Sequence, residues 1–115
     1  VMRHEMTLFP RPYASIASGQ KTIELRLYDE KRQSIQIGDQ IRFTNTEDAS
    51  QTTLCEVVGL HVFKDFRELY EKLPLLQCGN TPEDVDNAHP DDMLTYYSKE
   101  KQAQYGVVGI ELKRI

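Results

Sequence analysis

The hydrophobic period of this chain changes at Gly19, and that change constrains the fold more than any other feature. Residues 12–18 carry apolar side chains at helical spacing and a proline in the first turn, which predicts a short helix. Glycine suits the end of this helix because it adopts a left-handed backbone without penalty. Residues 22–27 then alternate as in a half-buried strand, with apolar Ile23, Leu25 and Leu27. We therefore expect a helix that leads directly into a strand.

The polar face of this strand is densely charged. Lys21 stands at its start, and Glu24 and Arg26 follow on one face. These residues either form ion pairs on a solvated surface, each worth under about 1 kcal/mol, or hold a polar ligand. Arginine can grip a phosphate or carboxylate in its fork, and lysine can serve as a point charge or a general base. The residues alone leave both interpretations open. Because Lys21 lies outside the apolar alternation, we expect Lys21→Ala to change stability by no more than about 0.5 kcal/mol.

Further strands and helices are expected along the chain. Apolar alternation predicts strands at 4–9, 40–45, 52–63 and 107–113, and capping patterns predict helices beginning near Asp65, Thr81 and Pro90. Residues 28–38 are expected to form a charged loop. Because regular crossover helices do not separate the strands, the order favours an α+β fold, with a small, mostly antiparallel sheet or barrel and helices at its ends. With 115 residues, we expect a single domain over 1–115.

The balance of charge limits the kind of ligand. The formal net charge is -4, which disfavours a broad basic face for nucleic acid. Basic residues gather locally, however, and predict a small basic cleft; they include Lys21, Arg26, Lys31 and Arg32. The six tyrosines include candidates for stacking on a base; they are Tyr13, Tyr28, Tyr70, Tyr96, Tyr97 and Tyr105. We take the four basic residues, with Glu24 and Tyr105, as the predicted ligand-binding set.

Several kinds of chemistry find no support in the sequence. The three histidines are isolated from one another and from the cysteines, so we expect no metal site. Neither a phosphate loop nor a dinucleotide fingerprint is present, so we expect no cofactor. No apolar run approaches the roughly 18 residues of a membrane-spanning helix, and no signal peptide is visible. Cys55 and Cys78 are expected to be buried free thiols of a cytoplasmic protein.

The charged segment matches a known family pattern. Gly19, Lys21, Glu24 and Arg26 form G-x-K-x-x-E-x-R, which resembles the signature of the ASCH domain. The preceding helix, the turn at 38–39 and the closing strand at 105–112 also fit this family. The resemblance implies a PUA-like fold, in which helices flank a small β-barrel. It also implies a cleft lined by the motif residues and a role linked to RNA or nucleotides.

The resemblance, read with the residues, gives a leading functional hypothesis. The chain would bind RNA or a nucleoside-type small molecule and would have no membrane partner. Lys21 and Arg26 would contact the phosphate or base, and Glu24 would orient Lys21 or accept a hydrogen bond from a base amino group.

A metal-independent amidohydrolase acting on acylated nucleosides such as acetylated cytidine is the alternative. One bacterial branch of the family uses a Lys, a Thr and a Glu for this reaction. Lys21 matches the Lys, Glu24 stands in place of the Thr, and Glu83 is the candidate for the distal Glu. Lys21 and Glu24 would then be catalytic, with Lys21 activating water, Glu24 carrying the proton and Arg26 stabilising the oxyanion. A protein-interaction module without a ligand is the third hypothesis.

Overall fold

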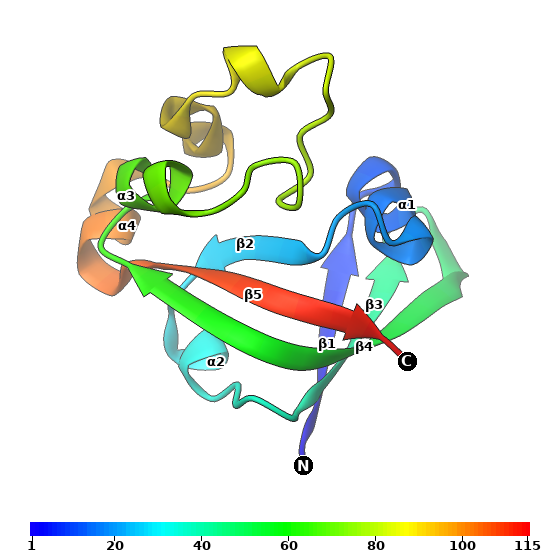
Figure 1. Cartoon of the computed structure of the whole chain (residues 1–115). Helices are drawn as coiled ribbons and strands as arrows, with labels where there is room; N and C mark the ends of the chain where they lie inside the picture. Colours follow the sequence, from blue (N-terminus) through cyan, green and yellow to red (C-terminus); the bar gives the residue numbers. More distant parts are fainter.

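A computed structural model describes all 115 residues as a curled sheet with most of its helices on one side and one short helix on the other (Figure 1). The elements in chain order are β1 (Arg3–Leu8), α1 (Pro10–Ser18), β2 (Ile23–Leu27), α2 (Glu30–Gln33), β3 (Gln40–Asn45), β4 (Asp48–Phe63), α3 (Phe66–Lys72), the short 3-10 helices η1 (Val85–Asn87) and η2 (Pro90–Thr95), α4 (Lys99–Tyr105) and β5 (Val107–Arg114).

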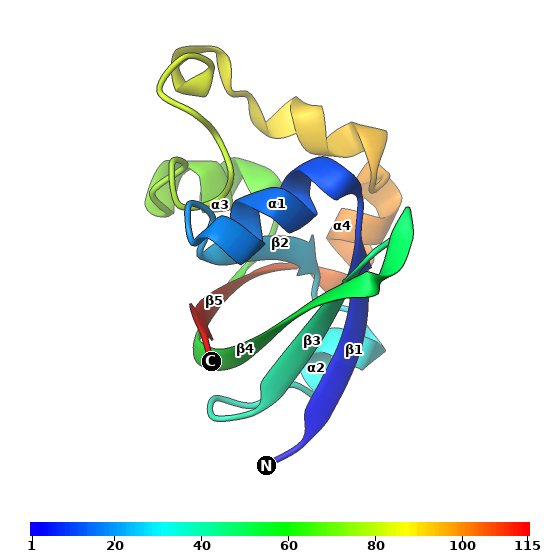
Figure 2. The ribbon, with the colours of Figure 1, turned by 90° about the vertical axis from the view of Figure 1, so that its right-hand side faces the viewer.

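The sheet contains five strands in the order β1-β3-β4-β5-β2. Only β1 and β3 pair in parallel, and the other neighbours are antiparallel. The long strand β4 pairs with β3 along its first half and with β5 along its second, and its register shifts between Val57 and Gly59. The predicted irregularity at Gly59 is thus confirmed. The result is the expected α+β, mostly antiparallel architecture in the form of a half-barrel, with α1 across one end (Figure 2).

Two apolar clusters hold the structure together. The larger fills the inside of the curl and consists of Met6, Leu8, Tyr13, Ile16, Ile35, Ile41, Phe43, Cys55, Val57, Val108, Ile110 and Leu112. The smaller joins β2 to α3 and consists of Ile23, Leu25, Leu27, Phe66, Leu69, Cys78 and Val107. Both cysteines are buried and free, as expected. Strand β5 contributes to both clusters, with Val107 in the smaller one and Val108, Ile110 and Leu112 in the larger one, so this strand is covered on both faces.

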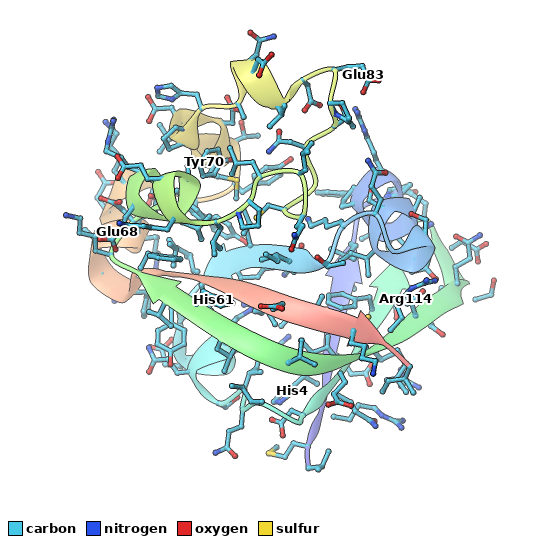
Figure 3. The ribbon with its side chains drawn as sticks, viewed as in Figure 1. His4, His61, Glu68, Tyr70, Glu83 and Arg114 are labelled. Atoms are coloured by element: carbon cyan, nitrogen blue, oxygen red, sulfur yellow. The ribbon has the colours of Figure 1, made fainter.

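Local sequence explains where the main helices begin and end. Helix α1 ends at Gly19, whose φ of 87° is left-handed, and the Arg114 guanidinium donates to the Ala17 carbonyl at the same end (Figure 3). Helix α3 begins after Asp65, whose carboxylate accepts a hydrogen bond from the Glu68 backbone N–H at 3.0 Å. These two predicted helices are therefore confirmed.

The structure differs from the local predictions at several places. The expected loop at 28–38 contains the short helix α2, which Asp29 caps, and it buries Ile35. The helix expected near Thr81 is only the 3-10 helix η1, which begins at Val85. The helix expected at Pro90 does begin there but as the 3-10 helix η2, and neither buries a residue because this polar stretch offers little apolar surface to pack. Helix α4 was not predicted, since only Gln102 of its seven residues is buried and no apolar period marks it.

None of the helices combines the length and the hydropathy needed to span a membrane.

Candidate functional site

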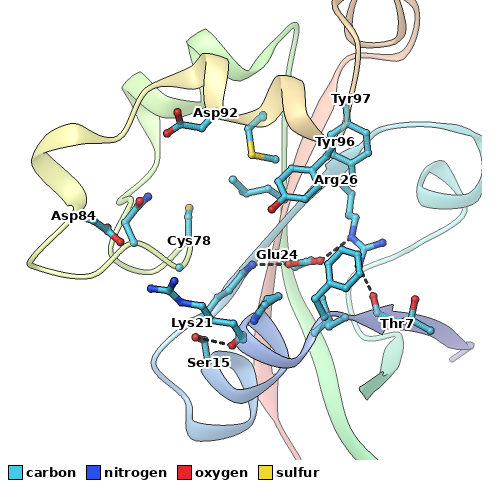
Figure 4. A pocket seen from close by; sticks show the side chains of 18 of the residues that line it. Thr7, Ser15, Lys21, Glu24, Arg26, Cys78, Asp84, Asp92, Tyr96 and Tyr97 are labelled. Atoms are coloured by element: carbon cyan, nitrogen blue, oxygen red, sulfur yellow. Dashed lines mark hydrogen bonds and ion pairs between the residues drawn. The ribbon is translucent and has the colours of Figure 1, made fainter. Parts of the chain in front are cut away.

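A cavity of about 510 Å³ lies along the free edge of β2 (Figure 4). This volume falls within the range of small-molecule sites. Its floor comes from the end of β1, from α1, from β2 and from one turn residue: Thr7, Leu8, Phe9, Arg11, Pro12, Ser15, Lys21, Glu24, Leu25, Arg26 and Thr46. Its roof comes from α3 and the segment that follows it: Tyr70, Cys78, Gly79, Asn80, Asp84, Asp92, Met93, Tyr96 and Tyr97.

The three charged residues of the motif meet on the cavity floor. Glu24 Oε1 lies 2.8 Å from Lys21 Nζ, and Glu24 Oε2 lies 2.7 Å from Arg26 Nε. The exposed fractions of the Lys21, Glu24 and Arg26 side chains are 12%, 5% and 15%. The interpretation as a solvated strand face is therefore wrong. One carboxylate instead holds two cations in a fixed row beside a cavity, and we call these three residues the charged triad.

Glu24 and Arg26 are both ionised at neutral pH. Burial by itself would raise the pKa of Glu24, but the charges of Lys21 and Arg26 outweigh it and leave that pKa below its usual value. Burial would likewise lower the pKa of Arg26, but the Glu24 carboxylate outweighs it and raises that pKa above its usual value. Two cations and one anion leave a net positive charge on the floor, with Lys21 and Arg26 on either side of Glu24.

Arg26 also closes the half-barrel. Its Nη2 donates to the backbone carbonyl of Thr7 at 3.0 Å, which links the two edge strands β2 and β1. Lys31 Nζ donates to the next outward-facing carbonyl of β1, that of Glu5, also at 3.0 Å. These two cations make hydrogen bonds that a neighbouring strand would otherwise make. Much of the Arg26 side chain is thus engaged by the protein itself, whereas Lys21 has only Glu24 as a side-chain partner.

The other residues predicted for the site lie outside the cavity lining. Lys31 holds β1, and Arg32 pairs with Asp29 at 3.1 Å. Tyr105 packs beside the smaller apolar cluster, with Lys101 Nζ 5.6 Å from its ring centre. Helix α2 carries the chain away from the cavity directly after β2, so nearness to the motif in sequence does not become nearness in space.

Glu83, the candidate for a distal carboxylate, is exposed at the outer end of the roof segment (Figure 3). Its neighbour Asp84 lines the cavity instead, as does Asp92. Each of these two carboxylates already accepts a hydrogen bond from a nearby backbone N–H, Thr81 to Asp84 and His89 to Asp92. They therefore shape the roof as well as line it.

The roof also supplies three of the six tyrosines that were considered for stacking, namely Tyr70, Tyr96 and Tyr97, in place of Tyr105. Tyr97 stacks on Phe66 with ring centres 5.9 Å apart, and Tyr96 lies beside it. Burial raises the pKa of Tyr70 to about 12 and also raises that of Tyr97, so both hydroxyls remain protonated.

The cavity contains no reactive thiolate and no cluster of metal-binding side chains. Burial raises the pKa of the Cys78 thiol to about 11, which keeps it protonated. No three His, Cys, Asp or Glu side chains in the chain lie close enough together to hold a metal ion.

The comparisons with known proteins agree with this architecture. A family model of the ASCH domain matches residues 6–115. The chain is similar to the crystal structure of hypothetical protein PH0355, with 34% identity over 99% of this chain and 100% of that one, at a TM-score of 0.79. It is also similar to protein PF0455 from Pyrococcus furiosus, with 32% identity over 99% and 98% of the two chains and a TM-score of 0.74. No curated protein matches the sequence.

A more distant structure shares the fold alone. The ASCH protein from Zymomonas mobilis is 13% identical, with a TM-score of 0.67 over 96% of this chain and 66% of that one. The expected PUA-like arrangement is thus confirmed. The match over nearly the whole length, together with the relatives above 30% identity, means that the chain belongs to the ASCH domain family.

Proposed function

We propose that the cavity binds one nucleoside-sized unit, either free or as part of single-stranded RNA, with Lys21 as its main polar contact. The observation that carries this proposal is the charged triad on the floor of a cavity of about 510 Å³. Burying charged side chains costs desolvation free energy, and charged groups retained beside an open cavity are typical of sites that bind a ligand with matching polar groups.

The charge of the cavity favours a small ligand over a long polyanion. The lining residues include three cations, Arg11, Lys21 and Arg26, and three carboxylates, Glu24, Asp84 and Asp92. These charges cancel, so the cavity has no excess with which to grip a row of phosphates. A single base with its sugar, and at most a few phosphates, suits this balance better.

Lys21 is the best placed of the three triad residues to contact a ligand. An ammonium carries three donors, and Glu24 accepts one of them. Arg26 already donates to both Glu24 and Thr7. Glu24 therefore serves to position Lys21, and Arg26 serves to position Glu24.

Hydrolysis of an acylated nucleoside such as acetylated cytidine is the second candidate function. The short contact between Lys21 and Glu24 favours it, because a paired amine and carboxylate beside a cavity can handle a proton. Water would add its oxygen to the acyl carbon, the acyl C–N bond would break, and the amine would leave with a proton. However, the two cations beside Glu24 make it a weak base, and Arg26 is held by Thr7 away from an oxyanion role. Binding therefore remains the first proposal.

The third hypothesis, a protein-interaction module without a ligand, gains no support from a charged cavity of this size.

The two candidate functions differ in what they require of Lys21. Cytidine, acetylated cytidine and a labelled hexanucleotide would be titrated into the protein by calorimetry and NMR, and any acetate released would be measured. Lys21→Ala should weaken binding about tenfold or more, because it removes a charge-assisted hydrogen bond. Lys21→Arg should keep part of the affinity but abolish any hydrolysis, since arginine cannot act as a base. Lys113→Ala, an exposed lysine on β5, is the matched control.

The burial of Lys21 changes the expected effect of Lys21→Ala on stability. Because the Lys21 side chain is mostly buried against Glu24, we expect Lys21→Ala to cost about 1–3 kcal/mol rather than under 0.5. Circular dichroism must show that the variant is folded before its binding is measured. If Lys21→Ala binds all three probes as tightly as the natural chain, the proposed function is wrong.

A further inference from the structure

Two aromatic side chains stand at the rim of the cavity. Phe9 and Tyr96 both line it, and each is 61% exposed. The charged triad, in contrast, is largely buried. This difference in exposure orders the cavity by depth, with the two rings at the rim and the charges at the bottom.

The rings come from opposite sides of the opening. Phe9 lies in the chain between β1 and α1, which belong to the floor, and Tyr96 follows η2 in the roof, where Figure 4 shows its ring. Neither belongs to an apolar cluster. The backbone of each is nevertheless tied down, because Phe9 O accepts from Tyr13 N at 2.9 Å and Tyr96 N donates to Met93 O at 3.0 Å. The backbone of both residues is thus held in place, and their rings extend from it without being part of the core.

We propose that Phe9 and Tyr96 form a stacking clamp that holds one unpaired purine or pyrimidine base. Every base has a flat π face, and aromatic side chains bind such faces without requiring a particular sequence. A base between the two rings would direct one polar edge toward the bottom of the cavity. Lys21 and Glu24 lie there as hydrogen-bond partners for that edge.

This clamp rests on the proposed function. It adds that the rim of the cavity recognises the base of the ligand. The base can come from a free nucleoside or from an unpaired nucleotide of RNA. Cytidine and a hexanucleotide are the two probes that separate these sources, and ribose, which has a sugar but no base, is the negative probe.

The test replaces each ring with a side chain that is apolar but not flat. Phe9→Leu and Tyr96→Leu should each weaken the binding of cytidine about fivefold or more, since each removes one stacking face. Tyr96→Phe keeps the ring and should bind within about twofold of the natural chain. Val62→Ala, at an exposed apolar residue that does not line the cavity, is the control and should change nothing. A hexanucleotide that binds more tightly than cytidine and loses the same factor in both leucine variants supports RNA as the source.

The outcomes separate the clamp from the proposed function. If both leucine variants bind cytidine and the hexanucleotide as tightly as the natural chain while Lys21→Ala loses affinity, the clamp is wrong and the proposed function stands. If ribose binds as tightly as cytidine, or if Val62→Ala loses as much affinity as the leucine variants, the clamp is also wrong. If the natural chain binds neither cytidine nor the hexanucleotide, both proposals fail.

Discussion

At the residue scale, Glu24 organises the charges of the cavity. Its carboxylate is the shared partner of Lys21 and Arg26, and it is itself only 4% exposed. Replacing it would leave two buried cations without their counter-charge. Such a loss costs much more than the removal of a surface ion pair, because the remaining charges stay desolvated.

We therefore expect Glu24→Gln, which keeps the shape of the side chain, to lower the free energy of unfolding by about 3–5 kcal/mol. Glu111→Gln removes the more exposed pair with His61 and should cost no more than about 1 kcal/mol. Urea unfolding of both variants at neutral pH makes the comparison. Equal losses in the two variants would mean that the charged triad contributes no more than a surface pair.

The lowered pKa of Glu24 also gives this contribution a pH dependence. Because the pKa is below 4.5 in the folded chain, the contribution is fully present above that pH and is lost as the pH falls through the folded value. The difference in stability between the natural chain and Glu24→Gln should therefore shrink in acid.

At the element scale, side chains on turns fasten the first strand to the rest of the sheet. Asp39, in the turn before β3, accepts a hydrogen bond from Met2 N at its Oδ1, at 3.1 Å. Its Oδ2 accepts from Gln36 N at 3.0 Å and lies 2.9 Å from His4 Nε2, and the side chains of Asp39 and His4 are both buried. The predicted turn at 38–39 thus does more than reverse the chain, because its aspartate anchors the start of β1.

Asp39→Asn should destabilise the chain in a pH-dependent way. The hydrogen bond from His4, followed by those from Met2 and Gln36, lowers the pKa of Asp39 from 3.8 to about 2. A lowered pKa stabilises the folded state fully above pH 3.8, and that gain is lost as the pH falls through about 2. Urea unfolding from neutral to acid pH measures the free energy of unfolding of both chains. The difference in this free energy between Asp39→Asn and the natural chain should narrow over this pH window.

The exposed Asp86→Asn is the control for this series and should match the natural chain throughout. If the loss of stability in Asp39→Asn stays constant down to the lowest pH, the stabilisation does not come from the ionised carboxylate of Asp39.

At the scale of the whole molecule, charge limits the contact with nucleic acid. The chain has a net charge of -4, and three cations at most can face a ligand in the cavity, balanced by as many carboxylates. A long RNA would therefore find few phosphate contacts, whatever its length.

If the hexanucleotide binds, we expect its affinity to depend only weakly on salt. Each phosphate contact on a single strand contributes about 0.7 to the slope of log K against log salt. With at most three contacts, that slope should be no steeper than about -2. Fluorescence anisotropy at several salt concentrations measures this slope. A much steeper slope would mean that RNA lies across a surface other than this cavity.

Local patterns were enough to predict much of the fold. The helix that ends at Gly19, the alternation of β2, the cap at Asp65 and the irregularity at Gly59 depend on residues near one another in the chain. Backbone preferences and hydrophobic period act at this range, so they can be read without the tertiary structure. The motif residues Lys21, Glu24 and Arg26 were found in the same way.

The tertiary structure decided what surrounds those residues. Glu24 is buried because Arg26 reaches the edge of β1 and because a roof from the second half of the chain covers the free edge of β2. Lys31 and Arg32 turn away on α2, a helix too short and too charged to show a period. Phe9 and Tyr96 face one cavity although they lie near opposite ends of the sequence. Alternation specifies which side of a strand a residue occupies, but the burial of that side depends on which distant segments pack against it.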